Sequence, residues 1–440
     1  MLFLLQACSK TDKCLKFQLI KMKADIIIHN SQLLTCASNG KAKKGVAMQD
    51  LGIIENGAVA ISNGKITAVG KSEEILREFT SENTLDANGK TVSPGFVECH
   101  THIVFAGNRL NEFELKIKGA DYLEILANGG GILSTVRQTR EASLADLVEQ
   151  SRSRLDKLLN LGVTTCEIKT GYGLDTETEL KMLEAIFELD KMHEVDLIPT
   201  FLPAHAVPQE FKGNADEYVN LICNEMLPKA REIINYQLPN INYFVDVFCE
   251  KNAFDLEQSR KVLETAKSLG FKLKAHVDEF TNLGGARMAI ELGATSIDHL
   301  DAISSEEISL LADSETIGVV TPTVNFNFGS KEFADARILI DSVCAVALST
   351  DYNPGSAPCP SLPNAMAIAC RYQKLLPSET FNAVTINAAF AVGSSDKIGS
   401  IEKGKTADLI IFDTKDYREI AYEFGGNLIK TIIKNGNIVR

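Results

Sequence analysis

Eight apolar runs recur along the middle of the chain, and this repetition constrains the fold more than any other feature. They read PGFVECHTH, GVTTCEIKTGYG, VDLIPTFLPAH, NYFVDVFCE, FKLKAHVDEF, ATSIDHL, TIGVVTPT and VCAVALSTDYNPG. Helical stretches such as SLADLVEQSRSRLDKLLNLG separate them, and the spacing of roughly 30 to 50 residues is typical of successive strand–helix units. Continuous apolar strands suit a parallel sheet covered by helices. Eight such units predict an α/β fold, namely a (β/α)8 TIM-type barrel.

Each run is apolar first and polar at its carboxyl-terminal end. In a (β/α)8 barrel these ends share one face, and that face holds the active site. The polar residues at the ends are His100, His102, Glu167, Lys169, His205, Glu250, His276, Glu279, His299, Thr321, Thr323 and Asp351. They include five of the seven histidines in the chain. Chance placement would scatter the histidines, so we expect an active site at this face.

The two ends of the chain share a different pattern. Short alternating runs are separated by Asn-Gly and Gly turns, as in GAVAISNGKITAVG near the start and IKTIIKNGNIVR at the end, which is typical of β structure. We expect residues 22–91 and 392–440 to form one small β-sandwich domain, and residues 92–391 to form the barrel. Residues 1–21 are expected to be an extension, disordered or signal-like, although their apolar run is short for a signal peptide and lacks a basic start.

The composition limits the partners of such a chain. A formal net charge of -13 argues against nucleic acid or an anionic membrane as the main partner. After the N-terminus, no segment approaches the roughly 20 apolar residues of a membrane span. Ten cysteines are scattered without a CxxC pair, which suggests reduced thiols in the cytoplasm. We therefore expect a cytoplasmic protein with a small-molecule ligand, no nucleic-acid partner and no membrane attachment.

His100 and His102 stand one residue apart at the end of the first run. Both side chains lie on the same face of a strand, because the side-chain period of a strand is two. A third imidazole at His276 and a carboxylate at Asp351 would complete a metal site of a kind that suits zinc or iron. The competing interpretation is that each histidine is a hydrogen-bonded core residue. It suits a lone histidine better than a pair in register with two further strand ends.

A metal at this point would lower the pKa of bound water toward about 7 and make hydroxide available at neutral pH. Hydrolysis also needs a base and a proton donor, and we consider Glu279, His299 and Asp351 the catalytic candidates. Glu279 follows His276 closely, His299 at the next strand end can orient the hydroxide or stabilise a charged intermediate, and Asp351 could also shuttle a proton. Glu279 could instead be a solvated loop carboxylate.

These features resemble the amidohydrolase superfamily, whose barrels carry a His-x-His opening strand, later histidines and a last-strand aspartate beside a flanking β-sandwich. From about residue 23 to the C-terminus the chain resembles the imidazolonepropionase family more closely. The His-x-His motif alone marks only the superfamily. The resemblance is carried by PGFVECHTHIVFAGNR, YLEILANGGGILSTVRQTR, EIKTGYGLDTETELKML, FLPAHAVP, AHVDEFTNLGGA and STDYNPGSAPCPSLPNAM, within which GGGILSTV, KTGYGL and TDYNPGS together are specific.

The resemblance implies hydrolytic opening of 4-imidazolone-5-propanoate to N-formimidoyl-L-glutamate in histidine degradation, by a homodimer. It implies one divalent or trivalent metal ion, Zn or Fe, held by His100, His102, His276 and Asp351. The substrate has a propionate tail, and a guanidinium can hold a carboxylate through two hydrogen bonds. The implied substrate-binding residues are Arg109 for this carboxylate, then Tyr122, Tyr172, His205, Glu279, Asn353, Gly355 and Ser356. Tyr122 could merely pack, and the YNPGS segment could be only a turn.

Two alternatives stay open. Another amidohydrolase, such as a nucleobase deaminase, would share the metal set but would not require a carboxylate anchor. A metal-free homologue that acts as a binding protein is the second alternative. Such homologues tend to lose ligands, and all four ligand residues are present here.

Overall fold

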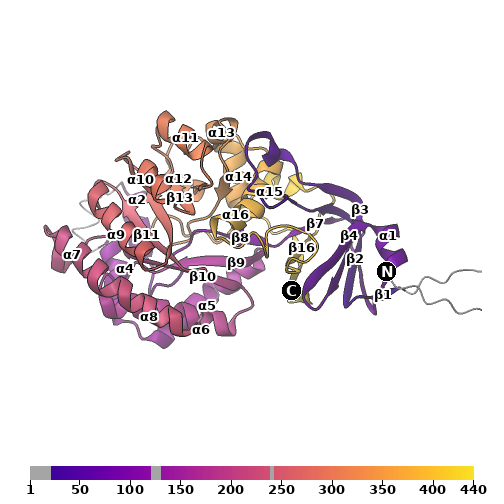
Figure 1. The fold of residues 1–440 in the computed structure, drawn as a ribbon, viewed down its shortest axis with the longest axis horizontal. Coiled ribbons are helices and arrows are strands. Elements are labelled where there is room, and N and C mark those ends of the chain that lie inside the picture. Colours follow the sequence, from indigo (N-terminus) through magenta and orange to yellow (C-terminus); the bar gives the residue numbers. More distant parts are fainter. Residues whose placement is uncertain (1–20, 120–129, 238–241) are drawn as a thin grey trace, which may run out of the picture.

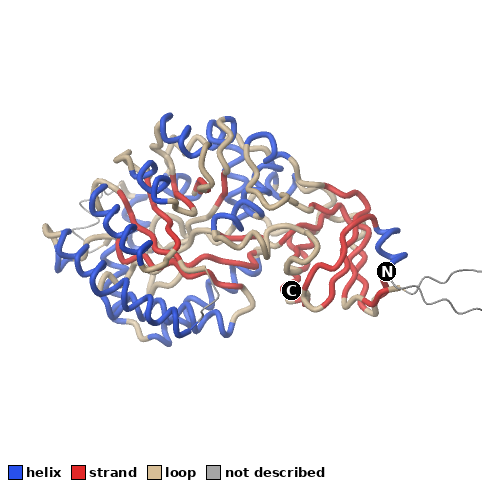
Figure 2. Tube along the Cα trace, viewed as in Figure 1, coloured by secondary structure: helices blue, strands red, loops and turns tan. Residues whose placement is uncertain are grey.

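The computed structural model describes residues 21–119, 130–237 and 242–440. All but the last residue of the expected N-terminal extension, and Tyr122 of the expected substrate site, lie outside these ranges. Figure 1 shows a large part, in which helices surround strands, beside a smaller part built mainly of strands. Figure 2 shows the same division by secondary structure.

Eight parallel strands form the sheet of the large part. Their order in the sheet, from β8 to β15, is their order in the sequence, and each neighbouring pair is parallel. The strands are β8 (Phe96–Glu98), β9 (Val163–Lys169), β10 (Asp196–Ala204), β11 (Phe244–Cys249), β12 (Lys272–Val277), β13 (Ser296–His299), β14 (Ile317–Val320) and β15 (Val346–Leu348). Each lies within one of the eight apolar runs, so the predicted barrel strands are confirmed.

The barrel closes through residues that follow β8 and β15. Thr101 forms an isolated parallel bridge with Tyr352, and the amide of His102 donates to the carbonyl of Tyr352 at 3.0 Å. The Glu98 carboxylate, at the end of β8, accepts a hydrogen bond from the Thr350 hydroxyl at 2.7 Å. A short bridge and side chains therefore take the place of a long strand ladder at this seam.

Helices connect the barrel strands and cover their outer side (Figure 1). Several start at side chains that bind exposed backbone amides: Ser143 caps α5 and Asp255 caps α9, as expected for N-caps. Among the described helices, none has the length and apolar character that a membrane span requires. The helices that follow β8 in the sequence are α2 (Leu110–Ile117), α4 (Ile132–Glu141), α5 (Leu144–Asn160), α6 (Thr176–Met192), α7 (Ala215–Leu221), α8 (Leu227–Gln237), α9 (Leu256–Ser268), α10 (Gly285–Leu292), α11 (Ser305–Ala312), α12 (Pro322–Phe328), α13 (Ala336–Asp341), α14 (Leu362–Tyr372), α15 (Pro377–Val384), α16 (Ile386–Ala391) and α17 (Arg418–Tyr422).

Strands from both ends of the chain share one sheet in the smaller part. β16 pairs with β7, and β7 pairs with β2, which gives the order β18-β17-β16-β7-β2-β3-β4 with β6 paired to β2. The strands are β2 (Ile26–Leu34), β3 (Ile53–Ser62), β4 (Lys65–Lys71), β6 (Asn83–Asp86), β7 (Thr91–Pro94), β16 (Leu409–Phe412), β17 (Ile429–Lys434) and β18 (Asn437–Ile438). A second sheet pairs β1 (Met22–Lys23) with β5 (Phe79–Thr80), and α1 spans Ser72–Glu78. The predicted β domain built from both ends is confirmed.

The barrel interior contains an apolar cluster and a polar cluster. Val97, Ile198, Phe244 and Val319 pack with residues of α16 in one hydrophobic core. The polar cluster consists of six charged residues without solvent exposure: Glu98, Glu167, Lys169, Asp246, Lys274 and Asp298. Charged groups are rarely buried without partners, so these six residues are expected to contact one another or neighbouring polar groups.

Candidate metal centre and active site

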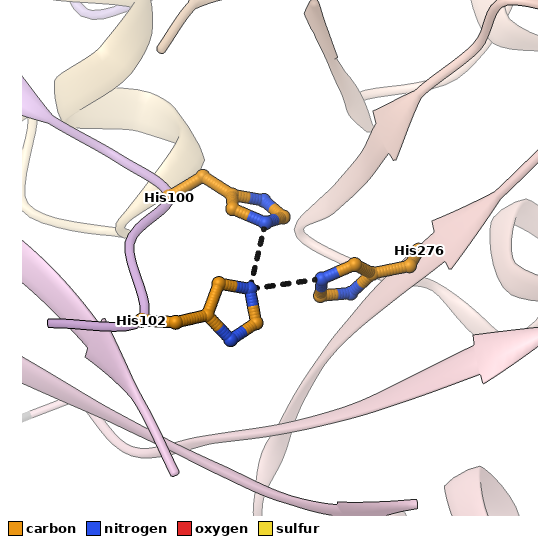
Figure 3. Close-up of side chains that lie close together, drawn as sticks. All are labelled: His100, His102 and His276. Carbon is orange, nitrogen blue, oxygen red and sulfur yellow. Dashed lines mark hydrogen bonds between the residues drawn. The ribbon is translucent and has the colours of Figure 1, made fainter. Parts of the chain in front are cut away.

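The four side chains predicted as metal ligands converge on one point, and Figure 3 shows the three histidines among them. Nε2 of His102 lies 3.3 Å from Nε2 of His100 and 3.3 Å from Nε2 of His276. Oδ1 of Asp351 lies 3.5 Å from Nε2 of His100 and from Nε2 of His102. Tetrahedral donors at the usual zinc distances of about 2.0–2.2 Å would be about 3.3–3.6 Å apart. The spacing therefore fits a single metal ion.

Hydrogen bonds show where the imidazole lone pairs point. Nδ1 of His100 lies 2.6 Å from Asp298 Oδ2, and Nδ1 of His276 lies 3.0 Å from Asp246 Oδ1. Each carboxylate accepts the Nδ1 proton and leaves Nε2 as a lone-pair donor. His102 has no such partner for Nδ1 in the described ranges, and a cation between the three Nε2 atoms would satisfy the lone pairs that face one another there. Oδ1 of Asp351 is buried and has no hydrogen-bond partner in the described ranges, which is what a metal ligand requires.

The surroundings of His100 and His102 favour the neutral form of both rings. Burial lowers the pKa of His100 well below its ordinary value, and the charge of Lys169 lowers it further. Burial, followed by the neighbouring His205, lowers the pKa of His102 in the same direction. Neutral imidazole is the form that binds metals. Burial raises the pKa of Asp351, and a cation at the four-donor point would oppose that effect.

A buried lysine joins the carboxylates that contact these histidines. Nζ of Lys169 lies 2.7 Å from Oε1 of Glu167, 2.8 Å from Oδ2 of Asp246 and 3.7 Å from Oδ2 of Asp298. The sequence places Glu167 and Lys169 at a strand end without indicating a role, and no motif in it points to Asp246 or Asp298. Asp246 and Asp298 could have been found as the acidic residues inside two buried strands, FVDVFC and SIDH. A buried carboxylate needs a partner, so each pointed to a cation or hydrogen-bond donor nearby.

Glu279 and His299 lie beside the four donors. Nε2 of His299 is 3.9 Å from Oε2 of Glu279, and its Nδ1 is 3.1 Å from the Thr321 hydroxyl. Donor atoms of His299, His100 and Asp351 all lie within 4.8 Å of one another. Burial, and then the charge of Asp351, raises the pKa of Glu279 well above its ordinary value. A carboxyl group with a raised pKa is still protonated near neutral pH and can therefore act as a general acid.

A cavity of about 630 Å³ opens over this point and is lined by His102, His276, His299 and Asp351. This volume is typical of small-molecule sites. The substrate-binding residues predicted from the sequence, as far as they lie in the described ranges, all line it: Arg109, Tyr172, His205, Glu279, Asn353, Gly355 and Ser356. The structure thus brings together the predicted metal, proton-transfer and substrate groups, with Tyr122 outside the described residues.

His205 and Tyr172 form an aromatic wall next to the donors. The ring of His205 stacks on that of His102, with centroids 4.8 Å apart and planes at 20°. Its Nδ1 lies 3.0 Å from the carbonyl of Gly171, and the ring of Tyr172 lies 5.4 Å away. Burial raises the pKa of Tyr172, so its phenol remains a hydrogen-bond donor.

Arg109 reaches the cavity from the start of α2. Its Nε and Nη2 donate to Oε2 of Glu112 at 2.9 and 2.5 Å. Its Nη1 approaches Gly355 so closely that a Cβ atom built on Gly355 would lie 1.9 Å from it. Within the described ranges, Nη1 donates to no acceptor. The sequence indicates neither the Glu112 contact nor the approach to Gly355, since both depend on how the loop after β8 folds.

Asn353 shapes the loop that carries Gly355. Its Oδ1 accepts from the amides of Gly355 and Ser356, both at 2.8 Å, and its Nδ2 donates to the carbonyl of Asp351 at 2.7 Å. This is a side-chain-stabilised turn of the kind that asparagine favours. Glu250, whose Oε2 accepts from the amides of Phe280 and Thr281, similarly holds the segment after Glu279.

Known proteins are similar to this chain in sequence and in fold. Residues 91–439 match the model of the Amidohydrolase family. The solved structure of an adenosine deaminase from Xanthomonas campestris with bound zinc has a TM-score of 0.70 and 19% identity, and covers 95% of this chain and 93% of that chain. Guanine deaminase from E. coli has a TM-score of 0.70 and 16% identity, with coverages of 94% and 98%. At these identities the two structures support the barrel with its extra β domain and nothing finer.

Sequence relatives are much closer. Imidazolonepropionase of Chloroflexus aggregans is 51% identical over 419 residues, which are 94% of this chain and 98% of that relative. Imidazolonepropionase of Alkaliphilus oremlandii is 48% identical over 422 residues, with coverages of 95% and 98%. Identity at this level over nearly the whole of both chains shows the family. The chain belongs to the amidohydrolase family and, within it, to the imidazolonepropionases.

Proposed function

We infer that the protein hydrolyses 4-imidazolone-5-propanoate to N-formimidoyl-L-glutamate, the ring-opening step of histidine degradation. The observation that supports the inference is a single cavity with an arginine in its wall, next to two overlapping groups of possible metal ligands, His100, His102 and His276 and His100, His299 and Asp351. Relatives named imidazolonepropionase at 45–51% identity support the same activity. A nucleobase deaminase would share the metal donors, but its neutral substrate would not require a guanidinium in the cavity wall.

The donor set proposed for the metal is His100, His102, His276 and Asp351. Three imidazoles and one carboxylate suit both zinc and iron. When bound, the metal supplies a hydrolytic nucleophile at neutral pH by lowering the pKa of water. Elemental analysis of the purified protein should find about one zinc or iron per chain, in line with the single four-donor point.

We assign proton transfer to Asp351, Glu279 and His299. In the reaction the oxygen of water bonds to the ring carbonyl carbon, the ring C–N bond breaks, and the leaving nitrogen takes a proton. Asp351 takes the proton of the attacking water, and Glu279 gives its own to the nitrogen, a role that its raised pKa favours. His299 can stabilise the developing oxyanion through Nε2–H if its Nδ1 accepts from Thr321.

We assign the propionate of the substrate to Arg109, with Tyr172 beside it. His205 and Glu279 face the imidazolone ring, and the loop that contains Asn353, Gly355 and Ser356 borders the pocket. Tyr122 remains part of the proposed set on the resemblance alone. The support for these assignments is that the described members line one cavity.

A hydrolysis assay tests the proposed function. Imidazolone propanoate should be turned over at rates typical of enzymes, with cytosine and guanine as alternative substrates. Turnover of either base without turnover of imidazolone propanoate would favour the deaminase alternative. A protein that holds metal and turns over none of the three would contradict both.

Arg109→Ala should lower kcat/KM by roughly 10- to 200-fold. The change removes a charge-assisted contact to the substrate carboxylate of about 1.5–3 kcal/mol, at about 1.4 kcal/mol per tenfold change in rate. Metal content should stay the same, because Arg109 is not among the four donors. Steady-state kinetics and elemental analysis of wild type and variant measure both quantities.

A substrate analogue without the carboxylate provides the control for Arg109. Wild type and Arg109→Ala should hydrolyse it equally poorly, and an equal slowing of analogue and natural substrate would exclude Arg109 as the anchor. Arg109→Lys should restore activity only in part, because an ammonium cannot present the two parallel donors of a guanidinium. Glu112→Gln, which keeps Arg109 but weakens its present ion pair, should leave the preference for the carboxylate intact.

Gly355→Ala should raise KM by about 5- to 30-fold, as expected if about 1–2 kcal/mol of the charge-assisted contact is lost. The new methyl group would take the place of the Arg109 guanidinium, and this flexible side chain can move aside without unfolding the loop. The melting temperature and metal content should therefore stay close to those of wild type. A KM equal to that of wild type would show that the close approach of Arg109 to Gly355 is not needed.

We also propose the domain and assembly organisation expected from the sequence. Residues 92–391 would form the catalytic barrel, residues 22–91 and 392–440 the β domain, and residues 1–21 an extension. Pairing between β7 and β16 supports the composite domain. Assembly as a cytoplasmic homodimer rests on the family resemblance, and sedimentation of the purified protein would test it.

A further inference from the structure

Lys169 lies among three carboxylates next to the metal donors, and no role assigned above uses it. Its side chain is fully buried. It follows Glu167 by two positions on β9, so both side chains point to the same side of the sheet. We propose that Lys169 is a positioning residue that holds the three histidine ligands in place through these carboxylates, an inference that rests on the proposed metal-dependent function.

Two of the carboxylates connect Lys169 directly to imidazole rings. Asp246 binds Nζ of Lys169 through Oδ2 at 2.8 Å and Nδ1 of His276 through Oδ1 at 3.0 Å. Asp298 binds Nδ1 of His100 through Oδ2 at 2.6 Å, and the same oxygen lies 3.7 Å from Nζ of Lys169. Partners of this kind fix both the tautomer and the ring orientation of a metal-binding histidine.

The third carboxylate connects Lys169 to the backbone between the other two ligands. Oε1 of Glu167 accepts from Nζ of Lys169 at 2.7 Å, and its Oε2 accepts from the amide of Thr101 at 3.2 Å. The backbone amide of Lys169 also donates to the carbonyl of Thr101 at 2.9 Å. Thr101 separates His100 from His102, so one ammonium is linked to all three histidines.

The three connections depend on Lys169 to different degrees. Oδ1 of Asp298 also accepts from the Ser296 hydroxyl at 2.7 Å, which would hold that carboxylate if Lys169 were lost. Oδ1 of Asp246 likewise accepts from the amides of Val247 and His276 at 2.7 and 3.1 Å, whereas its Oδ2 has no second donor within the described ranges. Burial would lower the pKa of Lys169, but the charges of Asp246, Glu167 and Asp298 outweigh it and keep the ammonium charged. Nζ of Lys169 donates to Asp246 at 2.8 Å but lies 3.7 Å from Asp298, so loss of Lys169 should act mainly through Asp246 and His276.

Lys434 on β17 offers a matched control. Its side chain is also fully buried, and its Nζ lies 2.6 Å from Asp196 and 2.8 Å from Asp408. In the described part of the chain neither of these aspartates contacts a histidine of the donor set. Lys434→Met thus removes the same type of buried charge without disturbing the metal donors.

The experiment compares wild type, Lys169→Met and Lys434→Met. Each full-length protein is stripped of metal and titrated with zinc in competition with a chromophoric chelator, and the stability of the metal-free form is measured by urea unfolding. Both variants should be less stable, because each leaves at least one buried carboxylate without its cation. Lys169→Met should lower the zinc affinity by about 10- to 100-fold, the usual effect of losing a residue that orients ligands. Lys434→Met should keep it within about twofold, as expected for a distant site.

A double variant tests whether Lys169 acts through Asp246. Asp246→Asn alone should weaken zinc binding. If both residues act through one contact, Lys169→Met combined with Asp246→Asn should be little weaker than the more affected single variant. Fully additive losses would show that Lys169 does not act through this carboxylate.

Two results would overturn the proposal: wild-type zinc affinity in folded Lys169→Met, or equal losses in Lys169→Met and Lys434→Met. If Lys169→Met does not fold, Lys169→Arg takes its place, since it keeps the charge but moves the donor atoms. Reduced zinc affinity with an unchanged melting temperature then supports the proposal, and wild-type affinity overturns it. The zinc content and hydrolysis rate of the wild type test the proposed function separately, whereas the ratio between variants tests Lys169.

Discussion

Asp351→Asn is expected to lower kcat/KM by about 10³-fold or more, with a matching loss of bound metal. Oδ1 of Asp351 lies 3.5 Å from two imidazole nitrogens and has no hydrogen-bond partner in the described ranges. A neutral amide supplies no charge to a cation, and its N–H groups can donate to the imidazole lone pairs and occupy the site. A bound metal contributes several kcal/mol to such a reaction, and about 4 kcal/mol corresponds to roughly 10³-fold.

Metal content separates this expectation from simple misfolding. Elemental analysis and steady-state kinetics should be measured on the same preparation of Asp351→Asn, with Asp408→Asn measured in parallel as the control. Asp408 is also buried, but its partner is Lys434 in the β domain, so its variant should lose stability and keep its metal. Asp351→Asn with a full complement of metal and nearly normal kcat/KM would remove Asp351 from the donor set.

The barrel and the donor set follow from the sequence because each rests on local patterns. Apolar runs separated by helical stretches identify the strands, and the period of two predicts that His100 and His102 share one face; their Nε2 atoms do lie together, although β8 ends at Glu98 and both histidines follow it. The strand ends in a barrel share one side, which brings His276 and Asp351 to the same place without any knowledge of loop structure. These predictions need only the direction of each strand and its position in the order.

The groups behind the donors could not be found in this way. Lys169, Asp246 and Asp298 stand on β9, β11 and β13, and their contacts depend on the depth at which each side chain enters the barrel. A one-residue change in register would direct a side chain to the other face. The contact of Arg109 with Glu112 is likewise set by the fold of the first loop, which no periodic pattern describes. Strand patterns predict where a side chain emerges, whereas its partners depend on packing.

Glu279→Gln is expected to lower kcat by about 10²- to 10⁴-fold, the usual contribution of a positioned proton donor or acceptor. Glutamine has nearly the same shape but cannot transfer a proton. Glu279 lines the cavity and lies 3.9 Å from His299, and it is not one of the four converging donors. Metal content should therefore stay unchanged and KM should change little, which distinguishes this variant from Asp351→Asn and from Arg109→Ala.

Two further variants sharpen the test of Glu279. Glu307→Gln alters another buried glutamate, at the third position of α11, where it completes a capping box that glutamine can also form. Its kcat should equal that of wild type. Glu279→Asp keeps an acid but shortens it, so part of the lost rate should return. If Glu279→Gln instead raised KM without lowering kcat, Glu279 would bind the substrate equally in the ground and transition states. The proton to the leaving nitrogen would then have to come from another group in the cavity.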